Sequence, residues 1–525
     1  MHVVTAAEMR RMDQLTIQAH GVPSLRLMER AGQGVVDVIL QRWTQLAKRG
    51  ALVVAGKGNN GGDGLVVARL LHQREFPCEV ACVARADELS PDAATNLQRY
   101  RTAGGRFTEI PDGDLDALRD RFGDKGLLVD ALLGTGLHAP VKGFLADVVE
   151  LMNASGLPII AVDTPSGLDA DKGGPLGSTI QADVTVTLGY PKTGQVVYPG
   201  VTYCGDLVVA DIGLWDQAVA EVAPAAELLD SAELVWLLPR RSEDSHKGSY
   251  GHLLVMAGSR GKTGAAVLCC RGAMRVGTGL VTLAAPRGLN DILAGALVEP
   301  MTETLGEPGA EQWPALGAGD WEALAERRNA VLFGPGVGVH EDAGRTLETL
   351  LEHCGLPWLI DADGLNNLAA DTSRLKEARV PPVLTPHPGE MGRLAGMDTA
   401  EVNADRIGIA RAFAAEHRCY LVLKGARTVA ATPEGRVSIN PTGNAGMATG
   451  GMGDVLAGII AGFLAQGFRP EDAMRLGVYI HGRAGDRVAD QHGEVGLIAS
   501  DLVDELPATI KELMQIREMV SGVQG

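Results

Sequence analysis

Residues 52–71 read LVVAGKGNNGGDGLVVARLL, in which an apolar run leads through a glycine-rich turn into a second apolar run with helical spacing. Apolar runs of four to six residues that end in Gly or Asp and lead into helix-period stretches recur along the chain. This alternation is typical of repeated βα units. The sequence therefore predicts an α/β fold with mainly parallel sheets.

Two series of such units follow one another. In the first series we expect strands at 51–55, 79–84, 127–131, 159–163, 183–188 and 207–211. In the second series we expect strands at 252–258, 279–284, 330–334, 357–361, 382–386 and 419–423, followed by a hairpin over 427–440 that turns at 433–435.

The stretch 214–235 between the two series is rich in Ala and Glu and shows neither a strand pattern nor a turn glycine. We therefore expect two doubly wound domains, at 1–220 and 241–515, joined by a linker at 221–240. Two domains also suit a chain of 525 residues, which is too long for one compact core.

Composition excludes several classes of protein. Hydrophobic residues make up 46% and charged residues 21%, as in ordinary globular domains. A net charge of −18 argues against partners such as nucleic acid or an anionic membrane, although helix N-termini can still hold phosphates locally.

No apolar run approaches about 18 residues, and the N-terminus lacks a signal-peptide pattern, so we expect a cytoplasmic protein. The seven cysteines suggest small core residues, and we assign them no role.

Polar residues follow three strands of the first domain. Asn59, Asn60 and Asp63 lie in the glycine-rich turn, while Asp130 and Asp163 end two later strands. Each alone is more often a cap or turn residue, but the carboxyl ends of parallel strands share one edge of a sheet, where ligands bind. We therefore expect a site here, with Asp63 as an anionic oxygen donor.

The first domain contains the segments GKGNNGGDG (56–64), LMERAG (27–32), VDALLGTGL (129–137), VDTPSGLDAD (162–171) and YPKTG (190–194). In combination these segments resemble the YjeF-type NAD(P)HX epimerases. The resemblance implies a Rossmann-like YjeF fold. It implies that the cofactor hydrate is bound by Asn59, Asn60, Gly61, Gly62, Asp63, Gly134, Thr135, Gly136, Leu137, His138, Ala139, Pro140 and Asp163. It also implies a K⁺ ion held by Asn60, Asp130 and Ser166, and such oxygen donors suit a hard cation.

Epimerisation at C6 of a hydrated nicotinamide can proceed by loss of water and its return from the opposite face. That route needs a group that transfers a proton. We expect Asp163 to be this acid or base, because a partly buried carboxyl group at a strand end can be tuned for proton transfer.

The second domain contains GNAGMATGGMGDVLAGIIAGFLAQG (443–467), a glycine-rich turn that opens a long apolar helix ending at Gly467. Such a turn and helix N-terminus can hold a phosphate. Asp454 in the first helical turn is either an acid favoured by the helix dipole or a functional group. The high number of glycines in this turn indicates that its backbone is shaped to fit closely around a ligand.

This turn resembles the anion hole and catalytic Asp of ribokinase-like folds, and the segments at 247–286, 333–338, 360–366, 384–391 and 423–429 resemble the ADP/ATP-dependent NAD(P)HX dehydratase domain. The domain order is similar to that of the bifunctional NAD(P)H-hydrate repair family. The resemblance implies that the hydrate touches Ala265, Gly338, His387 and Asp454. It implies that the nucleotide touches Lys424, Gly425, Ala426, Arg427, Thr428 and Gly453.

The chemistry expected of this second site follows from leaving-group ability. Phosphoryl transfer from ADP or ATP to the C6 hydroxyl, with Mg²⁺ on the phosphates, converts hydroxide into phosphate, which the ring nitrogen can expel. Asp454 would accept the hydroxyl proton. Lys424 and Arg427 can neutralise phosphate, with solvated strand-end cations as the alternative, and His387 is either a ligand or a structural residue.

Two other functions fit parts of the sequence. A ribokinase-like small-molecule kinase explains the GGMGD turn, but it gives no reason for the first domain. A first domain that only binds its ligand is a second alternative. We expect a homo-oligomer, because such domains commonly associate through apolar helix faces.

Overall fold

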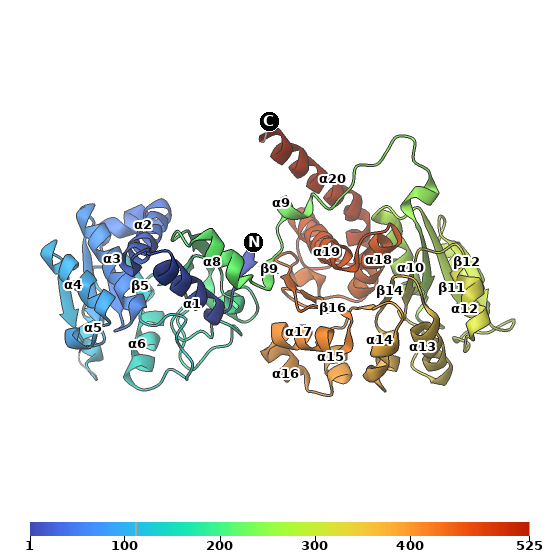
Figure 1. Ribbon diagram of the computed structural model, residues 1–525, viewed down its shortest axis with the longest axis horizontal. Helices are drawn as coiled ribbons and strands as arrows, with labels where there is room; N and C mark the ends of the chain where they lie inside the picture. Colours follow the sequence, from blue (N-terminus) through green and yellow to red (C-terminus); the bar gives the residue numbers. More distant parts are fainter. Residues whose placement is uncertain (111–112, 524–525) are drawn as a thin grey trace. The chain divides into compact units, whose positions relative to one another are not determined.

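The computed structural model describes residues 1–110 and 113–523 (Figure 1). The chain divides after Glu227 into two compact units, residues 2–227 and residues 228 onward. Both are α/β folds built on largely parallel sheets, so the expected fold class is confirmed.

The first unit contains a seven-stranded sheet in the order β4-β3-β2-β5-β6-β7-β8, and all its neighbouring strands are parallel. The strands are β2 (Ala51–Ala55), β3 (Cys78–Cys82), β4 (Arg106–Glu109), β5 (Leu127–Ala131), β6 (Ile159–Val162), β7 (Val184–Leu188) and β8 (Asp206–Ala210).

Helices cover both faces of this sheet, because successive side chains of each buried strand point to opposite sides. Val53 packs with α2 (Ser24–Arg49), α3 (Asn59–Gln73) and α4 (Pro91–Thr102). Leu52 and Val54 pack on the opposite face. The helices on that face are α5 (Leu115–Arg119) and α6 (Phe144–Asn153), and the unit also contains α1 (Ala6–Gln14), α7 (Gly200–Cys204) and α8 (Asp216–Val222).

The second unit contains strands in the order β18-β17-β16-β15-β14-β13-β10-β11-β12. Strands β10 to β16 pair in parallel, whereas β16, β17 and β18 pair antiparallel, so the expected hairpin is confirmed. The strands are β10 (His252–Met256), β11 (Leu280–Pro286), β12 (Met301–Leu305), β13 (Ala330–Phe333), β14 (Trp358–Ile360), β15 (Val383–Leu384), β16 (Tyr420–Leu423), β17 (Val429–Ala431) and β18 (Val437–Ile439).

One face of the second sheet is covered by α10 (Thr263–Arg275), α18 (Met452–Ala465), α19 (Pro470–His492) and α20 (Ala499–Val523), which pack against Leu253 and Val255. Figure 1 shows the orange helices of residues 388–417 on the other side of the strands from α18 and α19. The remaining helices are α9 (Ser231–Leu234), α11 (Asn290–Ala296), α12 (Ala318–Ala325), α13 (Glu341–His353), α14 (Asp363–Leu368), α15 (Pro388–Ala395), α16 (Thr399–Ala404) and α17 (Arg406–His417).

The expectation of no strand between 214 and 235 is wrong. Ala226–Leu228 forms β9, whose residues Ala226 and Glu227 pair antiparallel with β1 (His2–Val3). The edge strands β4 and β12 were also absent from the expected set. These three strands are only partly buried, so their sequences lack the continuous apolar run that marks a central parallel strand.

Among the described residues, no helix is both long enough and apolar enough to cross a membrane. All seven cysteines are buried and unbridged. Cys78 and Cys82 both lie on β3, where burial raises the pKa of each thiol.

Candidate functional site

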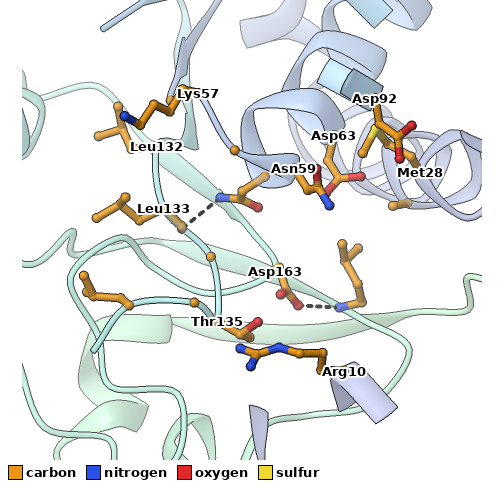
Figure 2. A pocket seen from close by; sticks show the side chains of 18 of the residues that line it. Arg10, Met28, Lys57, Asn59, Asp63, Asp92, Leu132, Leu133, Thr135 and Asp163 are labelled. Atoms are coloured by element: carbon orange, nitrogen blue, oxygen red, sulfur yellow. Dashed lines mark hydrogen bonds between the residues drawn. The ribbon is translucent and has the colours of Figure 1, made fainter. Parts of the chain in front are cut away.

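A cleft of about 1000 Å³ lies at the carboxyl edge of the first sheet (Figure 2). It is lined by residues that follow β2, β3, β5, β6 and β7, because parallel strands end on the same edge. Its lining includes Asn59, Asn60, Asp63, the turn 134–139 and Asp163. Gly61, Gly62 and Pro140, which the resemblance also placed at the hydrate, lie outside this lining.

The glycines in the turn after β2 are needed for close packing and not for a left-handed backbone conformation. Neither Gly61 nor Gly62 has a positive φ, and both belong to the first turn of α3. A Cβ on Gly61 would lie 2.0 Å from the carbonyl oxygen of Gly56, and a Cβ on Gly62 would lie 2.9 Å from the sulfur of Met28. The glycines therefore let α3 start directly against the strand end.

Helix α1 forms a wall of the cleft and contributes Arg10 and Asp13, which sequence reasoning missed. The segment before α1 is tied to the 191–193 turn by reciprocal backbone hydrogen bonds of Val4, each 2.9 Å. Burial, opposed by the charge of Lys192 and assisted by that of Asp163, raises the pKa of Asp13 to about 6. No motif of the sequence relates α1 to the strand ends, which are more than 40 residues away along the chain.

Asp63 differs from its expected role as an anionic oxygen donor. Its side chain is buried, and burial together with the charge of Asp163 raises its pKa well above the usual range. Burial and this charge therefore favour the protonated form of Asp63, in which the carboxyl group can donate a hydrogen bond.

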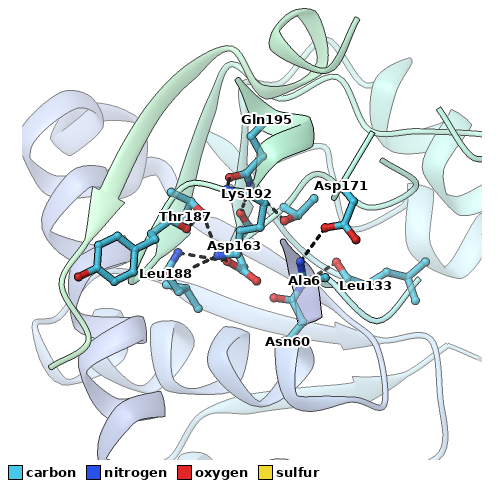
Figure 3. Close-up of polar contacts among 11 residues, drawn as sticks. Ala6, Asn60, Leu133, Asp163, Asp171, Thr187, Leu188, Lys192 and Gln195 are labelled. Atoms are coloured by element: carbon cyan, nitrogen blue, oxygen red, sulfur yellow. Dashed lines mark hydrogen bonds and ion pairs between the residues drawn. The ribbon is translucent and has the colours of Figure 1, made fainter. Parts of the chain in front are cut away.

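Asp163 is held in one orientation by its neighbours (Figure 3). Its backbone has φ of +66°, and its carbonyl oxygen accepts a hydrogen bond from Gln195 Nε2 at 2.6 Å. Its Oδ1 accepts hydrogen bonds from Leu188 N at 3.1 Å and from the ammonium group of Lys192. All these side-chain bonds use Oδ1, which leaves Oδ2 for a ligand.

Lys192 is the residue of this site that sequence reasoning missed, although it stands inside the YPKTG motif. Its side chain is 0% exposed, and it also donates to Thr187 Oγ1 and Leu188 O, each at 3.0 Å. An ammonium group has three protons to donate, and Lys192 uses them on Asp163 and these two oxygens. A fully buried lysine is stable only when it is paired in this way.

The three expected K⁺ ligands are linked to one another through hydrogen bonds to Leu133 O and between Ser166 and Asp130, and Asn60 also lines the cleft. Asp130 is completely buried, and its carboxylate accepts hydrogen bonds from Ser166 N at 2.8 Å and Ser166 Oγ at 2.6 Å. Asn60 Nδ2 donates to Leu133 O at 2.9 Å, while Asn60 Oδ1 is buried without a hydrogen-bond partner among the described residues. Amide, carboxylate, hydroxyl and carbonyl oxygens fit a hard monovalent cation, which would satisfy the orphaned Asn60 oxygen.

A second group of charged residues lies at the carboxyl edge of the second sheet. Lys424 follows β16, and its ammonium group lies 2.8 Å from Oδ1 of Asp361 and 3.7 Å from Oε2 of Glu390. Asp361 is 1% exposed. Burial lowers the pKa of Lys424, but these carboxylates outweigh burial and raise it. Lys424 is therefore a paired cation with only 17% of its side chain exposed, and the alternative of a solvated strand-end cation is wrong.

Asp454 lies beside this pair, in the first turn of α18. Gly451, with φ of +89°, directly precedes the helix, and a Cβ on Gly453 would lie 3.3 Å from Lys424 Nζ. Burial, with the nearby Asp361 carboxylate adding to it and Lys424 opposing it, raises the pKa of Asp454 to about 7. A carboxyl group with this pKa can accept a proton near neutral pH.

The expected hydrate ligands of this domain have structural partners. His387 caps α15, since its Nδ1 accepts hydrogen bonds from Gly389 N and Glu390 N at 3.0 and 3.3 Å. Its imidazole is 52% exposed, and its Nε2 lies 3.6 Å from Oε1 of Glu390. Gly338 N donates to Asp363 Oδ2 at 2.9 Å, and Ala265 lies in the first turn of α10.

Two further carboxylates of this site, Asp361 and Asp363, were not predicted from the sequence. Asp361 and Asp363 belong to the segment IDADGLN, and Asp363 also pairs with Lys262 at 2.7 Å. Ala362 between them has φ of +52°, a strained backbone for a residue other than glycine. The pattern of two aspartates separated by one residue, directly after a strand, is the feature of the sequence that could have identified them.

Comparison with known proteins identifies both units. A family model described as YjeF-related protein N-terminus matches residues 24–194, and one described as NAD(P)H-hydrate dehydratase matches residues 253–508. A crystal structure of the ADP/ATP-dependent NAD(P)H-hydrate dehydratase of Bacillus subtilis, co-crystallised with ATP and Mg²⁺, covers 54% of this chain and 97% of its own, with 32% identity and a TM-score of 0.47.

Full-length relatives share both units. The chain is 44% identical to the bifunctional NAD(P)H-hydrate repair enzyme Nnr of Moorella thermoacetica over 99% of this chain and 98% of the relative. It is 35% identical to the protein of the same name in Escherichia coli K12 over 95% of this chain and 92% of the relative. The chain belongs to the family of bifunctional NAD(P)H-hydrate repair enzymes.

Proposed function

We propose that the protein restores hydrated nicotinamide cofactors in two steps. The first unit interconverts the R and S epimers of NAD(P)HX, and the second unit dehydrates the S epimer at the expense of ADP or ATP. The observation that carries the proposal is Asp454, with a pKa of about 7, at a glycine-rich helix start beside the buried Lys424–Asp361 pair. This arrangement combines a proton acceptor with a site for phosphate.

In the first unit, Asp163 Oδ2 transfers the proton. The Asp163 carboxylate takes up a proton at Oδ2 and passes it to the C6 hydroxyl, the C6–O bond breaks, and the ring nitrogen lone pair forms an iminium. Water then adds to the opposite face of C6 and returns a proton to the carboxylate. The contacts of Lys192 and Leu188 support this role, because they fix Oδ1 of the carboxyl group while leaving Oδ2 open.

Asn60, Asp130 and Ser166 would hold a potassium ion, with the Leu133 carbonyl as a further oxygen. The bound cation would supply a positive charge that compensates the buried Asp130 carboxylate and orders the turns around it. The buried Asn60 Oδ1 without a partner is the support for this assignment.

In the second unit, the nucleotide lies along Lys424, Gly425, Ala426, Arg427 and Thr428 and at Gly453, and the hydrate contacts Ala265, Gly338, His387 and Asp454. Asp454 accepts the proton of the C6 hydroxyl as that oxygen attacks the terminal phosphorus of the nucleotide. Backbone N–H groups at 450–453 stabilise the charge on the phosphoryl oxygens. The ring nitrogen lone pair then expels phosphate and restores the dihydropyridine.

Mg²⁺ supplies charge neutralisation on the nucleotide phosphates. With ADP as the donor the products are AMP and phosphate, and with ATP they are ADP and phosphate. Lys424 adds a fixed positive charge near Gly453, which supports the placement of the phosphates there.

The test is incubation of the full chain with both hydrate epimers, K⁺, Mg²⁺ and either nucleotide. The proposal requires recovery of dihydronicotinamide absorbance from both epimers and release of inorganic phosphate. A phosphate ester that persists would indicate a small-molecule kinase instead. Recovery limited to the S epimer, with the R epimer bound but unchanged, would indicate that the first unit only binds.

We also infer a homo-oligomer. Ile292, Val298 and Met301 are 61%, 90% and 45% exposed, and they lie on or before the edge strand β12. Exposed apolar side chains beside an open strand edge favour association with a second copy. Light scattering on the purified chain measures the assembly directly, and a monomer at micromolar concentration would contradict this inference.

A further inference from the structure

The loop 423–428, which the proposed function assigns to the nucleotide, is held from beneath by Arg406. Arg406 is the first residue of α17, and its side chain is buried. Its Nη2 donates to Leu423 O at 3.1 Å and to Lys424 O at 3.2 Å, and its Nη1 donates to Ala426 O. One guanidinium therefore binds three carbonyl oxygens of one short loop.

No carboxylate pairs with Arg406 among the described residues, although most buried cations are paired. Its Nε is buried and has no hydrogen-bond partner in the same part of the chain. Burial lowers the pKa of the guanidinium to about 10, so it stays charged at neutral pH. A full positive charge beneath this loop is therefore compensated only by carbonyl dipoles.

The guanidinium also shapes the loop. In a trans peptide unit the C=O and the following N–H point in opposite directions. Because Arg406 turns the carbonyl oxygens of Lys424 and Ala426 inward, the N–H groups of Gly425 and Arg427 point away from it. Gly425 has φ of +135° and Arg427 has φ of +56°, and a Cβ on Gly425 would lie 3.1 Å from Arg406 Nη2.

We propose that Arg406 is a positioning residue for the polyphosphate of a nucleoside di- or triphosphate. It aims the N–H groups of Gly425 and Arg427 at the phosphates and places an uncompensated positive charge behind them. Backbone N–H groups that converge in this way form an anion site, and the buried charge acts through a medium of low dielectric constant. The inference rests on the proposed placement of the nucleotide along 424–428.

The test compares Arg406→Met with Arg406→Lys by titration calorimetry of ATP, ADP, AMP and adenosine in the presence of Mg²⁺. If Arg406 supplies a positive charge and aims N–H donors at the phosphates, replacing it should weaken nucleotide binding more as the number of phosphates increases. For Arg406→Met we expect Kd for ATP and ADP to rise about tenfold or more, since hydrogen bonds to charged groups are strong, with Kd for adenosine unchanged.

Arg406→Lys keeps the charge but loses the planar fork, so we expect a smaller rise of about threefold for ATP and ADP. The matched control is Arg411→Met, which removes the same charge from an exposed position of the same helix and should leave every Kd within about twofold. In turnover, Arg406→Lys should raise the KM for nucleotide more than it lowers kcat.

A purely structural role for Arg406 would weaken adenosine and ATP equally, and that result would overturn the inference. Unchanged ATP affinity in both variants would also overturn it. If Arg406→Met does not fold, the adenosine and ATP affinities of Arg406→Lys decide the question in the same way. A wild-type chain that binds no nucleotide would instead contradict the proposed function, and the inference with it.

Discussion

The ammonium group of Lys192 lies against Oδ1 of Asp163 inside the first unit, and the lysine side chain has no exposed surface. The two residues stand 29 positions apart in the chain. Lys192 therefore has no function on the surface, and its contacts with Thr187 and Leu188 hold it in place for the carboxylate.

Replacing Lys192 by methionine should lower the rate of epimer interconversion by about 100-fold, the lower end of the contribution of a positioned acid or base. The substitution leaves Asp163 without its counter-charge and without the donor that fixes Oδ1. The measurement is the rate of interconversion of purified R and S hydrates, with kcat falling more than KM changes.

Lys48→Met is the matched control, because Lys48 is exposed on α2 and lies outside the cleft lining. Nucleotide-dependent dehydration of the S epimer by the same Lys192 variant checks that the rest of the chain is intact. An epimerisation rate equal to that of the wild type would show that Lys192 does not serve Asp163.

Potassium should raise both the epimerisation rate and the melting temperature of the first unit, whereas choline at equal ionic strength should not. A ligand at 100 times its Kd stabilises a folded protein by about 2.7 kcal/mol. Asn60→Ala removes the buried oxygen that lacks a partner, so both responses should be lost. The experiment measures rate and Tm against KCl concentration. Equal K⁺ responses in the variant and the wild type would refute the cation site.

Asp454→Asn should lower dehydration by about 100- to 10,000-fold, because an amide cannot accept the hydroxyl proton. Epimerisation should be unaffected, since Asp163 lies in the other unit. Recovery of dihydronicotinamide from the S epimer measures the first activity, and interconversion of the epimers measures the second. Full dehydration by the variant would remove Asp454 from the mechanism.

The pH dependence of dehydration should follow the ionisation of Asp454. Its pKa is raised from 3.8 to about 7, and only the carboxylate accepts a proton. We therefore expect kcat/KM to rise with pH through about 7 and to level off above about 8, with a tenfold loss for each unit on the acid side. A rate that is flat between pH 6 and pH 8 contradicts this prediction.

Asp454→Asn should also stabilise the second unit at pH 8. A carboxyl group whose pKa is raised in the folded state binds protons more tightly there, so its contribution to stability declines as pH rises from about 4 to about 7. Removing the charge should recover roughly 2–4 kcal/mol at pH 8 and almost nothing at pH 4.

Denaturant unfolding at the two pH values measures this effect. Asp490→Asn, at an exposed position of α19, is the control and should change the free energy of unfolding by less than about 0.5 kcal/mol. An Asp454→Asn variant that is no more stable than the wild type at pH 8 would show that the ionised carboxylate does not lower the free energy of unfolding.

Local patterns were sufficient for most of the framework. The strand at 51–55, the turn and the helix that follows it are visible in the sequence, because burial on both faces of a parallel strand demands a continuous apolar run. β4 and β12 were missed because an edge strand is half exposed and carries no such run, and β9 was missed because its three residues are only partly buried. The position of α1 against the cleft was missed because it depends on pairing between residues far apart in the chain.

By itself the sequence determined that acids and glycines follow the strands of two α/β units, since those positions are fixed by local order along the chain. Only the tertiary structure decided which of these acids carry charge. The pKa of Asp63 is raised because its carboxyl group is buried near the charge of Asp163, and the pKa of Lys424 is raised because Asp361, 63 residues away in the chain, lies against its ammonium group. Ionisation depends on burial and on neighbours in space, and neither quantity is written in the order of the residues.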